Sequence, residues 1–288
     1  MVALSSTEAM LASLAHAKRA TFSAYTVRPG AVLAGLEAAA RAGTALDVTL
    51  DAKPYADSDG RLAAANAAAA KALRAAGAEV RLAPADRPVH LKGAVIDGEA
   101  FLDDRNWADD GAETVVKTTE PDDVACVGAA LEGTPRSDGR LATLKRDALE
   151  LEAHVIYGAR TDSIDCESEA FSFSVVYAGL QARAKTGAHV RLLVSERDLH
   201  DGRARGQVRE ARALADLQKL GVEVRVGGDD EKLCIAGDRA WVGSANATDG
   251  ARDDTIDWGM RTCDRAIVDG LEARFERNWA RGHALVEA

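Results

Sequence analysis

Two stretches of the chain, 140 residues apart, are variants of one motif, and this repeat constrains the fold more than any other feature. They occupy residues 90–106 and 230–246. Aligned without a gap, Lys92 falls on Lys232, and an asparagine closes both stretches. The copies differ in what they keep, because only the first retains a histidine and only the second retains Gly-Ser before the asparagine.

The repeat extends well beyond the motifs. Residues 73–82 resemble residues 217–226, and residues 34–36 resemble residues 178–180. The offset is 144 in these upstream segments and 140 at the motifs, so the second copy lacks about four residues before its motif. The chain is therefore predicted to consist of two homologous halves.

The sequence of each half predicts the same eight elements in the same order. These are a helix, a strand, a second helix, a second strand, the motif strand, its hairpin partner, a later strand and a closing helix. In the first half these are expected at 30–42, 46–50, 61–76, 78–82, 90–96, 99–103, 113–118 and 121–131. In the second half they are expected at 172–186, 189–194, 206–220, 222–226, 231–236, 239–243, 255–261 and 264–280. Alternating helices and strands favour an α/β sheet covered by helices.

A polar segment with glycine and proline at residues 133–140 is the predicted seam. It divides the chain into halves at 1–138 and 139–288. Two homologous halves that each bury a sheet face are expected to pack about a pseudo-twofold axis. We therefore expect a single site at their junction, to which each half contributes one motif.

Both motifs resemble the HxKxxxxD and GSxN signature of the phospholipase D superfamily. The resemblance implies a duplicated phospholipase D-like fold and a phosphodiesterase that works through a phosphohistidine without a metal or cofactor. The first copy keeps the histidine, lysine, aspartate and asparagine of the signature, namely His90, Lys92, Asp97 and Asn106. It has Asp103 and Asp104 where the signature has Gly and Ser.

The first motif supplies the candidate chemistry. Imidazole can attack phosphorus, which makes His90 the candidate nucleophile. Lys92 would stabilise the charge that develops on the phosphoryl oxygens, and Asn106 would donate a hydrogen bond to them. Asp97 belongs to the motif but lies on the other face of the expected strand, so it is expected to be structural. Glu113 is the candidate carboxylate that fixes the histidine tautomer.

The second motif has Asp230 in place of the histidine and Gly237 in place of the aspartate. Asp230 lies among three consecutive acids, and their repulsion could raise its pKa enough for it to act as a general acid or base; an acidic turn exposed to solvent is the alternative. Lys232, Ser244 and Asn246 are expected to bind substrate phosphate in this half. Asp257, eleven residues after Asn246 and in a place comparable to that of Glu113, is a further candidate for substrate binding.

Two further pairs of acidic residues have more than one possible role. Asp103 and Asp104 either turn away from the site, bind a cation, or contact a positively charged group of the substrate. The first alternative is favoured. Glu167 and Glu169, at the start of the second half, are further candidates for substrate contact.

The composition of the chain indicates which class of substrate it can bind. A net charge of −10 and an aromatic content of 5% argue against broad nucleic-acid binding. The substrate is therefore expected to be a phospholipid or a related small phosphodiester. The four cysteines have no metal-type spacing, and no leader or membrane span is apparent. We expect a cytoplasmic monomer without a metal.

Other functions remain open at this point. The loss of one histidine and one aspartate would also fit a pseudoenzyme that binds phosphate or phospholipid without turnover. A nuclease of the same superfamily is a further alternative, and the acidity of the chain counts against it.

Overall fold

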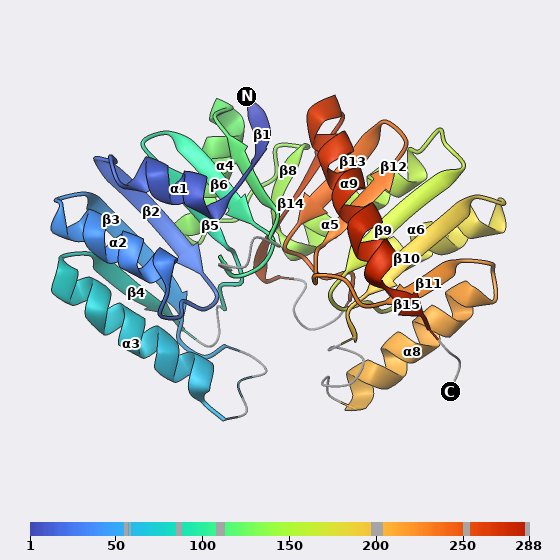
Figure 1. The fold of residues 1–288 in the computed structure, drawn as a ribbon, viewed down its shortest axis with the longest axis horizontal. Coiled ribbons are helices and arrows are strands. Elements are labelled where there is room, and N and C mark those ends of the chain that lie inside the picture. The colour runs from blue at the N-terminus through green and yellow to red at the C-terminus, as the bar shows by residue number, and fades with distance from the viewer. Residues whose placement is uncertain are drawn as a thin grey trace. The chain divides into compact units, whose positions relative to one another are not determined.

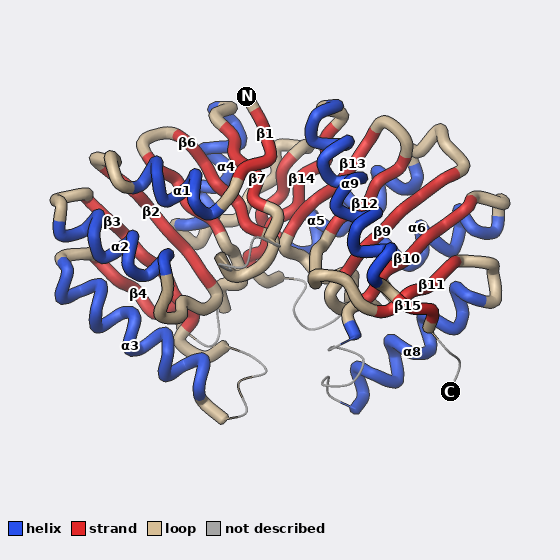
Figure 2. The backbone as a smooth tube through the Cα atoms, in the orientation of Figure 1, coloured by secondary structure: helices blue, strands red, loops and turns tan. Residues whose placement is uncertain are grey.

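The computed structural model describes residues 1–54, 57, 59–84, 88–107, 113–196, 204–249 and 254–285. The chain divides into two compact units, each with its own sheet and helices (Figure 2). The first unit comprises Met1–Asp138, Ala142–Leu144 and Thr255–Trp258. The second comprises Gly139–Leu141, Lys145–Asp254 and Gly259–Ala288. A short piece from late in the sequence, Thr255–Trp258, therefore belongs to the first unit.

In the first unit, the described residues form a seven-stranded sheet in the order β1-β7-β6-β5-β2-β3-β4. Its elements are β1 (Val2–Ser5), α1 (Thr7–Leu14), β2 (Arg19–Ala24), α2 (Ala31–Arg41), β3 (Ala45–Asp51), α3 (Arg61–Ala76), β4 (Glu79–Ala83), β5 (Gly93–Ile96), β6 (Glu99–Asp103), β7 (Val115–Thr118) and α4 (Pro121–Leu131). The β2, β3 and β4 strands are parallel, whereas β5, β6, β7 and β1 are joined by antiparallel pairs.

The second sheet has the order β15-β11-β10-β9-β12-β13-β14-β8. The elements are β8 (Leu141–Leu144), α5 (Lys145–Tyr157), β9 (Ser163–Ser168), α6 (Val175–Lys185), β10 (His189–Val194), α8 (Ala204–Gln218), β11 (Glu223–Val226), β12 (Leu233–Ala236), β13 (Arg239–Gly243), β14 (Ile256–Thr262), α9 (Arg265–Arg281) and β15 (His283–Ala284). Apart from β15, this order repeats that of the first sheet strand for strand, which is consistent with a duplicated fold.

Helices cover both faces of each sheet, which confirms the predicted α/β class. In the first unit, α2 and α3 pack on β3 and β4, and α4 packs on β2, β5 and β6 from the opposite face (Figure 1). In the second unit, α9 covers β9, β12 and β13 from one face, with α5 and α6 on the other (Figure 1). Because both faces are covered, the central strands are buried on both sides.

Most predicted elements lie within a few residues of the observed ones, and the predicted helix 61–76 coincides with α3. This helix ends where Gly77 adopts a left-handed conformation with φ of 106°, as expected for a glycine C-cap. The prediction missed the opening elements of each half, namely β1, α1, β2, β8, α5 and β9. Among the described residues, no helix is long and apolar enough to cross a bilayer.

Both motif strands are shorter than predicted. The β5 strand begins at Gly93 rather than at residue 90, and β12 begins at Leu233 rather than at residue 231. The reason in the first unit is a change of partner, because Val89 pairs with Ile256 at the start of β14 rather than with β2. His90 and Lys92 therefore lie in the segment that leads into the strand.

Candidate functional site

The backbone of His90 is fixed by the piece of β14 that belongs to the first unit. The Val89–Ile256 bridge is parallel, and the His90 N–H donates to the Ile256 carbonyl at 3.1 Å. This pairing sets the next residue of β14, Asp257, beside the histidine ring. The Asp257 carboxylate is hydrogen-bonded to Nδ1 of His90 across 3.0 Å.

His90, Asp257 and Lys92 form one hydrogen-bonded group. A carboxylate can only accept, so Nδ1 of His90 carries the hydrogen that Asp257 binds. Nζ of Lys92 lies 2.9 Å from Nε2 and 3.0 Å from Nδ1 of the same ring. An ammonium can only donate, so once Nδ1 bears the hydrogen that Asp257 binds, the nitrogen that can accept from Lys92 is Nε2. Lys92 is 2% exposed, and the His90 and Asp257 side chains are 12% and 4% exposed. With Nδ1 bonded to Asp257, the imidazole is held in the tautomer that has its hydrogen on Nδ1, and the Nε2 lone pair is available to the Lys92 ammonium.

Tyr25, directly after β2, completes the surroundings of this group. Its ring meets the His90 ring edge-on with centroids 4.9 Å apart. The ammonium of Lys92 lies 5.8 Å from the centroid of the same ring. Tyr25 therefore packs against both motif side chains, and sequence reasoning did not find it because β2 was not predicted.

The carboxylate beside His90 is Asp257, not Glu113 as predicted from the sequence. Glu113 is 5% exposed and accepts a hydrogen bond of 2.8 Å from the Thr7 hydroxyl. Asp257, in the place of the second half comparable to that of Glu113, had been expected to bind substrate, whereas here it bonds the histidine. Proximity along the chain misled the prediction, because the partner comes from a strand 167 residues beyond His90.

Asp103 and Asp104 are both fully buried and turn toward loop backbone. Asp103 accepts a hydrogen bond of 2.6 Å from the Trp107 N–H, and Asp104 accepts one of 2.8 Å from the Thr114 N–H. Burial raises the pKa of Asp103 to about 7, although the hydrogen bond from Trp107 opposes this. These contacts tie both carboxylates to the backbone of their own loop, as in the first of the three predicted alternatives, although the Lys92 ammonium is close enough to Asp103 to lower its pKa.

The two remaining residues of the first motif lie elsewhere. Asp97 adopts a left-handed conformation with φ of 45° between β5 and β6. Its carboxylate accepts hydrogen bonds of 2.9 Å from the backbone N–H groups of both Lys18 and Arg19, which lower its pKa. Asp97 therefore ties the turn to the start of β2, which is a structural role. Asn106 is exposed in the segment after β6.

In the second unit the motif lysine pairs with a carboxylate. Lys232 is 2% exposed and its Nζ lies 2.9 Å from a Glu169 oxygen. It also donates to the backbone carbonyl of Asp230 at 2.9 Å. Asp230, at the histidine position, adopts a left-handed conformation with φ of 62°. Lys232 therefore already has an anionic partner, which the sequence did not reveal.

The other phosphate-binding candidates of this unit lie close to the same loop. Asn246 accepts a hydrogen bond of 3.3 Å from the Ala170 N–H, and Ser244 is fully buried. Glu167 accepts hydrogen bonds from Asn278, and burial raises the pKa of Glu167 to about 8. Burial therefore favours the protonated, uncharged form of Glu167.

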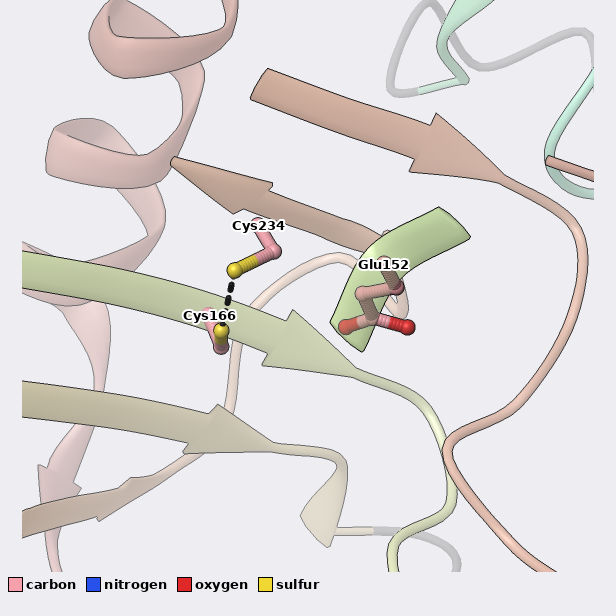
Figure 3. A group of neighbouring side chains, drawn as sticks. All are labelled: Glu152, Cys166 and Cys234. Atoms are coloured by element: carbon pink, nitrogen blue, oxygen red, sulfur yellow. Dashed lines mark hydrogen bonds between the residues drawn. The ribbon is translucent and has the colours of Figure 1, made fainter. Parts of the chain in front are cut away.

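Glu152, Cys166 and Cys234 form a group in the core of the second unit (Figure 3). Their ligand atoms lie within 4.8 Å of one another, and all three side chains are buried. The two sulfurs are 2.7 Å apart. Burial raises the pKa of all three groups, that of Glu152 to about 8, and so favours their uncharged forms.

These features define the class of protein as a duplicated α/β fold with a histidine–lysine motif in its first half. Residues 153–279 match the family model described as "Cardiolipin synthase, PLD-like domain". Among curated proteins, none matches the sequence.

Two of the similar solved structures, a phosphatidylserine synthase and a polyphosphate kinase, show the fold. Phosphatidylserine synthase from Haemophilus influenzae Rd KW20 gives a TM-score of 0.68 at 10% identity, over 99% of this chain and 87% of that one. Polyphosphate kinase from Porphyromonas gingivalis gives 0.65 at 17% identity, over 96% of this chain and 50% of that one, so this chain spans about half the length of the kinase. Nuc from Salmonella typhimurium, a phospholipase D family member, gives 0.42 at 19% identity, over 49% of this chain and 91% of that one. The predicted resemblance to the phospholipase D superfamily is confirmed.

Proposed function

We propose that the protein is a phosphodiesterase of the phospholipase D type in which His90 is the nucleophile. The observation that carries the proposal is the hydrogen-bonded group of Asp257, His90 and Lys92. A nucleophilic imidazole needs one nitrogen held as N–H by an acceptor and the other presented as a lone pair. In this group Asp257 binds Nδ1, and the Lys92 ammonium lies 2.9 Å from Nε2 and 3.0 Å from Nδ1.

In the proposed reaction, Nε2 of His90 attacks phosphorus and an N–P bond forms as the ester P–O bond breaks. The leaving oxygen takes up a proton, and water or an alcohol then attacks phosphorus and releases the imidazole. Lys92 would leave the Nε2 lone pair and bind the non-bridging oxygens, whose charge grows in the transition state. Asp257 would stabilise the positive charge that the ring gains on attack. No step in this scheme calls on a metal or cofactor.

The second motif is proposed to assist by binding phosphate through Lys232, Ser244 and Asn246. Asp230 remains a proposed acid or base for the leaving oxygen. Replacing Asp230 by alanine in an active enzyme tests it, since undiminished turnover would reject the role. The expectation that both motifs serve a single site stays a prediction.

The proposed substrate is a phosphodiester of a phospholipid or a related small molecule. The acidity of the chain disfavours nucleic acid, and the names of two similar proteins, a cardiolipin synthase family and a phosphatidylserine synthase, point to lipid phosphodiesters. The alternative is a pseudoenzyme that binds phosphate without turnover. The observation that favours it is the pairing of Lys232 with Glu169 in a motif that has no histidine.

The test is hydrolysis of bis-p-nitrophenyl phosphate in the presence of EDTA by the wild type, His90→Ala and His189→Ala. His189 is a matched control because it is exposed and pairs with Glu223 on the surface. We expect turnover that survives EDTA, vanishes in His90→Ala and persists in His189→Ala. Turnover retained by His90→Ala would reject the nucleophile, and binding of phosphate without turnover in any variant would favour the pseudoenzyme.

A further inference from the structure

The loop after β9 in the second unit is equivalent to the loop after β2 in the first. In the first unit Phe22 pairs with Ala94, and in the second Cys166 pairs with Cys234. The motif alignment places Ala94 on Cys234, so β2 and β9 correspond at an offset of 144, as the upstream repeat does. At this offset Tyr25 corresponds to Glu169.

A second pair of contacts confirms this correspondence. Two residues beyond Tyr25, the Val27 N–H donates to the buried Asn66 side chain at 3.0 Å. Two residues beyond Glu169, the Phe171 N–H donates to the buried Glu210 side chain at 2.9 Å. Asn66 and Glu210 are also 144 residues apart, so both loops are anchored in the same way.

Tyr25 and Glu169 contact the motif lysines of their units, but only Glu169 brings a negative charge to the lysine. Tyr25 offers an uncharged ring to Lys92, whose Nζ is hydrogen-bonded to a histidine. Glu169 places a carboxylate oxygen 2.9 Å from Nζ of Lys232. A carboxylate and a phosphate oxygen are both anionic acceptors for an ammonium, so they compete for the same donor. Lys232 is 2% exposed and Glu169 is 24% exposed, so the glutamate is the more accessible partner of this pair.

From this geometry we infer that Glu169 occupies the anion position of the second motif and must be displaced before Lys232 binds phosphate. The inference rests on the proposed function for its choice of phosphate as the ligand. It makes Glu169 the residue that determines whether this unit binds a phosphate group tightly. A ligand that carries a cation near its phosphate can displace Glu169 at lower cost, because the released carboxylate can pair with that cation.

The test is binding of inorganic phosphate, measured by calorimetry, to the wild type, Glu169→Gln, the Glu169→Gln/Lys232→Gln double variant and Glu276→Gln. Glutamine keeps the shape of Glu169 and removes its charge. Glu276 is the matched control, because it also pairs with a cation in this unit, at 2.6 Å from Arg191, and its loss changes net charge equally. We expect Glu169→Gln to bind phosphate about tenfold more tightly, a change of about 1.4 kcal/mol.

The double variant must lose this gain, and Glu276→Gln must not show it. Unchanged or weaker binding in Glu169→Gln, with a melting temperature like that of the wild type, overturns the inference. A gain that survives the loss of Lys232, or that also appears in Glu276→Gln, overturns it as well. The result is separate from that for the proposed function, since a chain with His90-dependent turnover and no gain in Glu169→Gln rejects only the role of Glu169.

Discussion

Replacing Asp257 by asparagine tests the geometry of the His90 group most directly. Asparagine keeps the size of the side chain but removes the charge that the imidazolium needs during attack. The hydrogen bond is charge-assisted, 3.0 Å long and almost wholly removed from solvent. Such bonds contribute about 1.5–3 kcal/mol, which corresponds to a roughly 10- to 150-fold fall in kcat/KM.

The assay is the initial rate of bis-p-nitrophenyl phosphate hydrolysis with EDTA, over a range of substrate concentrations. Because Asp257 acts on the developing charge, the loss should fall on kcat rather than on KM. Glu113→Gln is the matched comparison, since Glu113 is an equally buried acid that bonds Thr7 instead of His90. A larger loss of kcat in Glu113→Gln than in Asp257→Asn would refute the assignment of Asp257 as the residue that orients His90.

Two further predictions concern stability and pH. The pKa of Asp97 is lowered from 3.8 by backbone hydrogen bonds, so its contribution is present at neutral pH and is lost as pH falls through the lowered value. Asp97→Asn should therefore lower the melting temperature near pH 7, by an amount that shrinks as the pH falls below 3.8, with activity per folded molecule unchanged; a loss of kcat without a loss of stability would contradict the structural role. The pKa of Glu152 is raised from 4.5 to about 8, so the folded state holds a proton that the unfolded state has lost between these values, and stability falls as pH rises through that window. Glu152→Gln should remove this slope and melt higher than the wild type near pH 9, as scanning calorimetry at about pH 5 and pH 9 would show; a difference between the two proteins that is independent of pH would count against it.

The repeat and its motifs were readable from the sequence because the lysine-to-asparagine spacing is the same in both copies. The predicted class and most helices followed from periodicity and from glycines such as Gly77. The central strands β2 and β9 were missed although Arg-Ala-Thr-Phe-Ser-Ala and Ser-Ile-Asp-Cys-Glu-Ser alternate polar and apolar residues, because most of their apolar positions hold the small residues Ala and Cys and so give a weak signal. Missing these strands also concealed Tyr25 and the contact between Glu169 and Lys232.

The partner of His90 was missed for a different reason. Reasoning along the chain favoured Glu113 because it follows the motif closely. The segment before β5, however, pairs with β14, and only that pairing brings Asp257 to the ring. Spacing along a sequence does not report which distant strand a short segment will join.

The assignment of Thr255–Trp258 to the first unit bears on how the protein is made. During synthesis His90 leaves the ribosome long before Asp257, since 167 positions separate them. The histidine of a nascent chain therefore has no carboxylate to orient it until β14 has emerged. Under the proposed mechanism, a chain that is cut before that strand would lack the residue that orients its nucleophile.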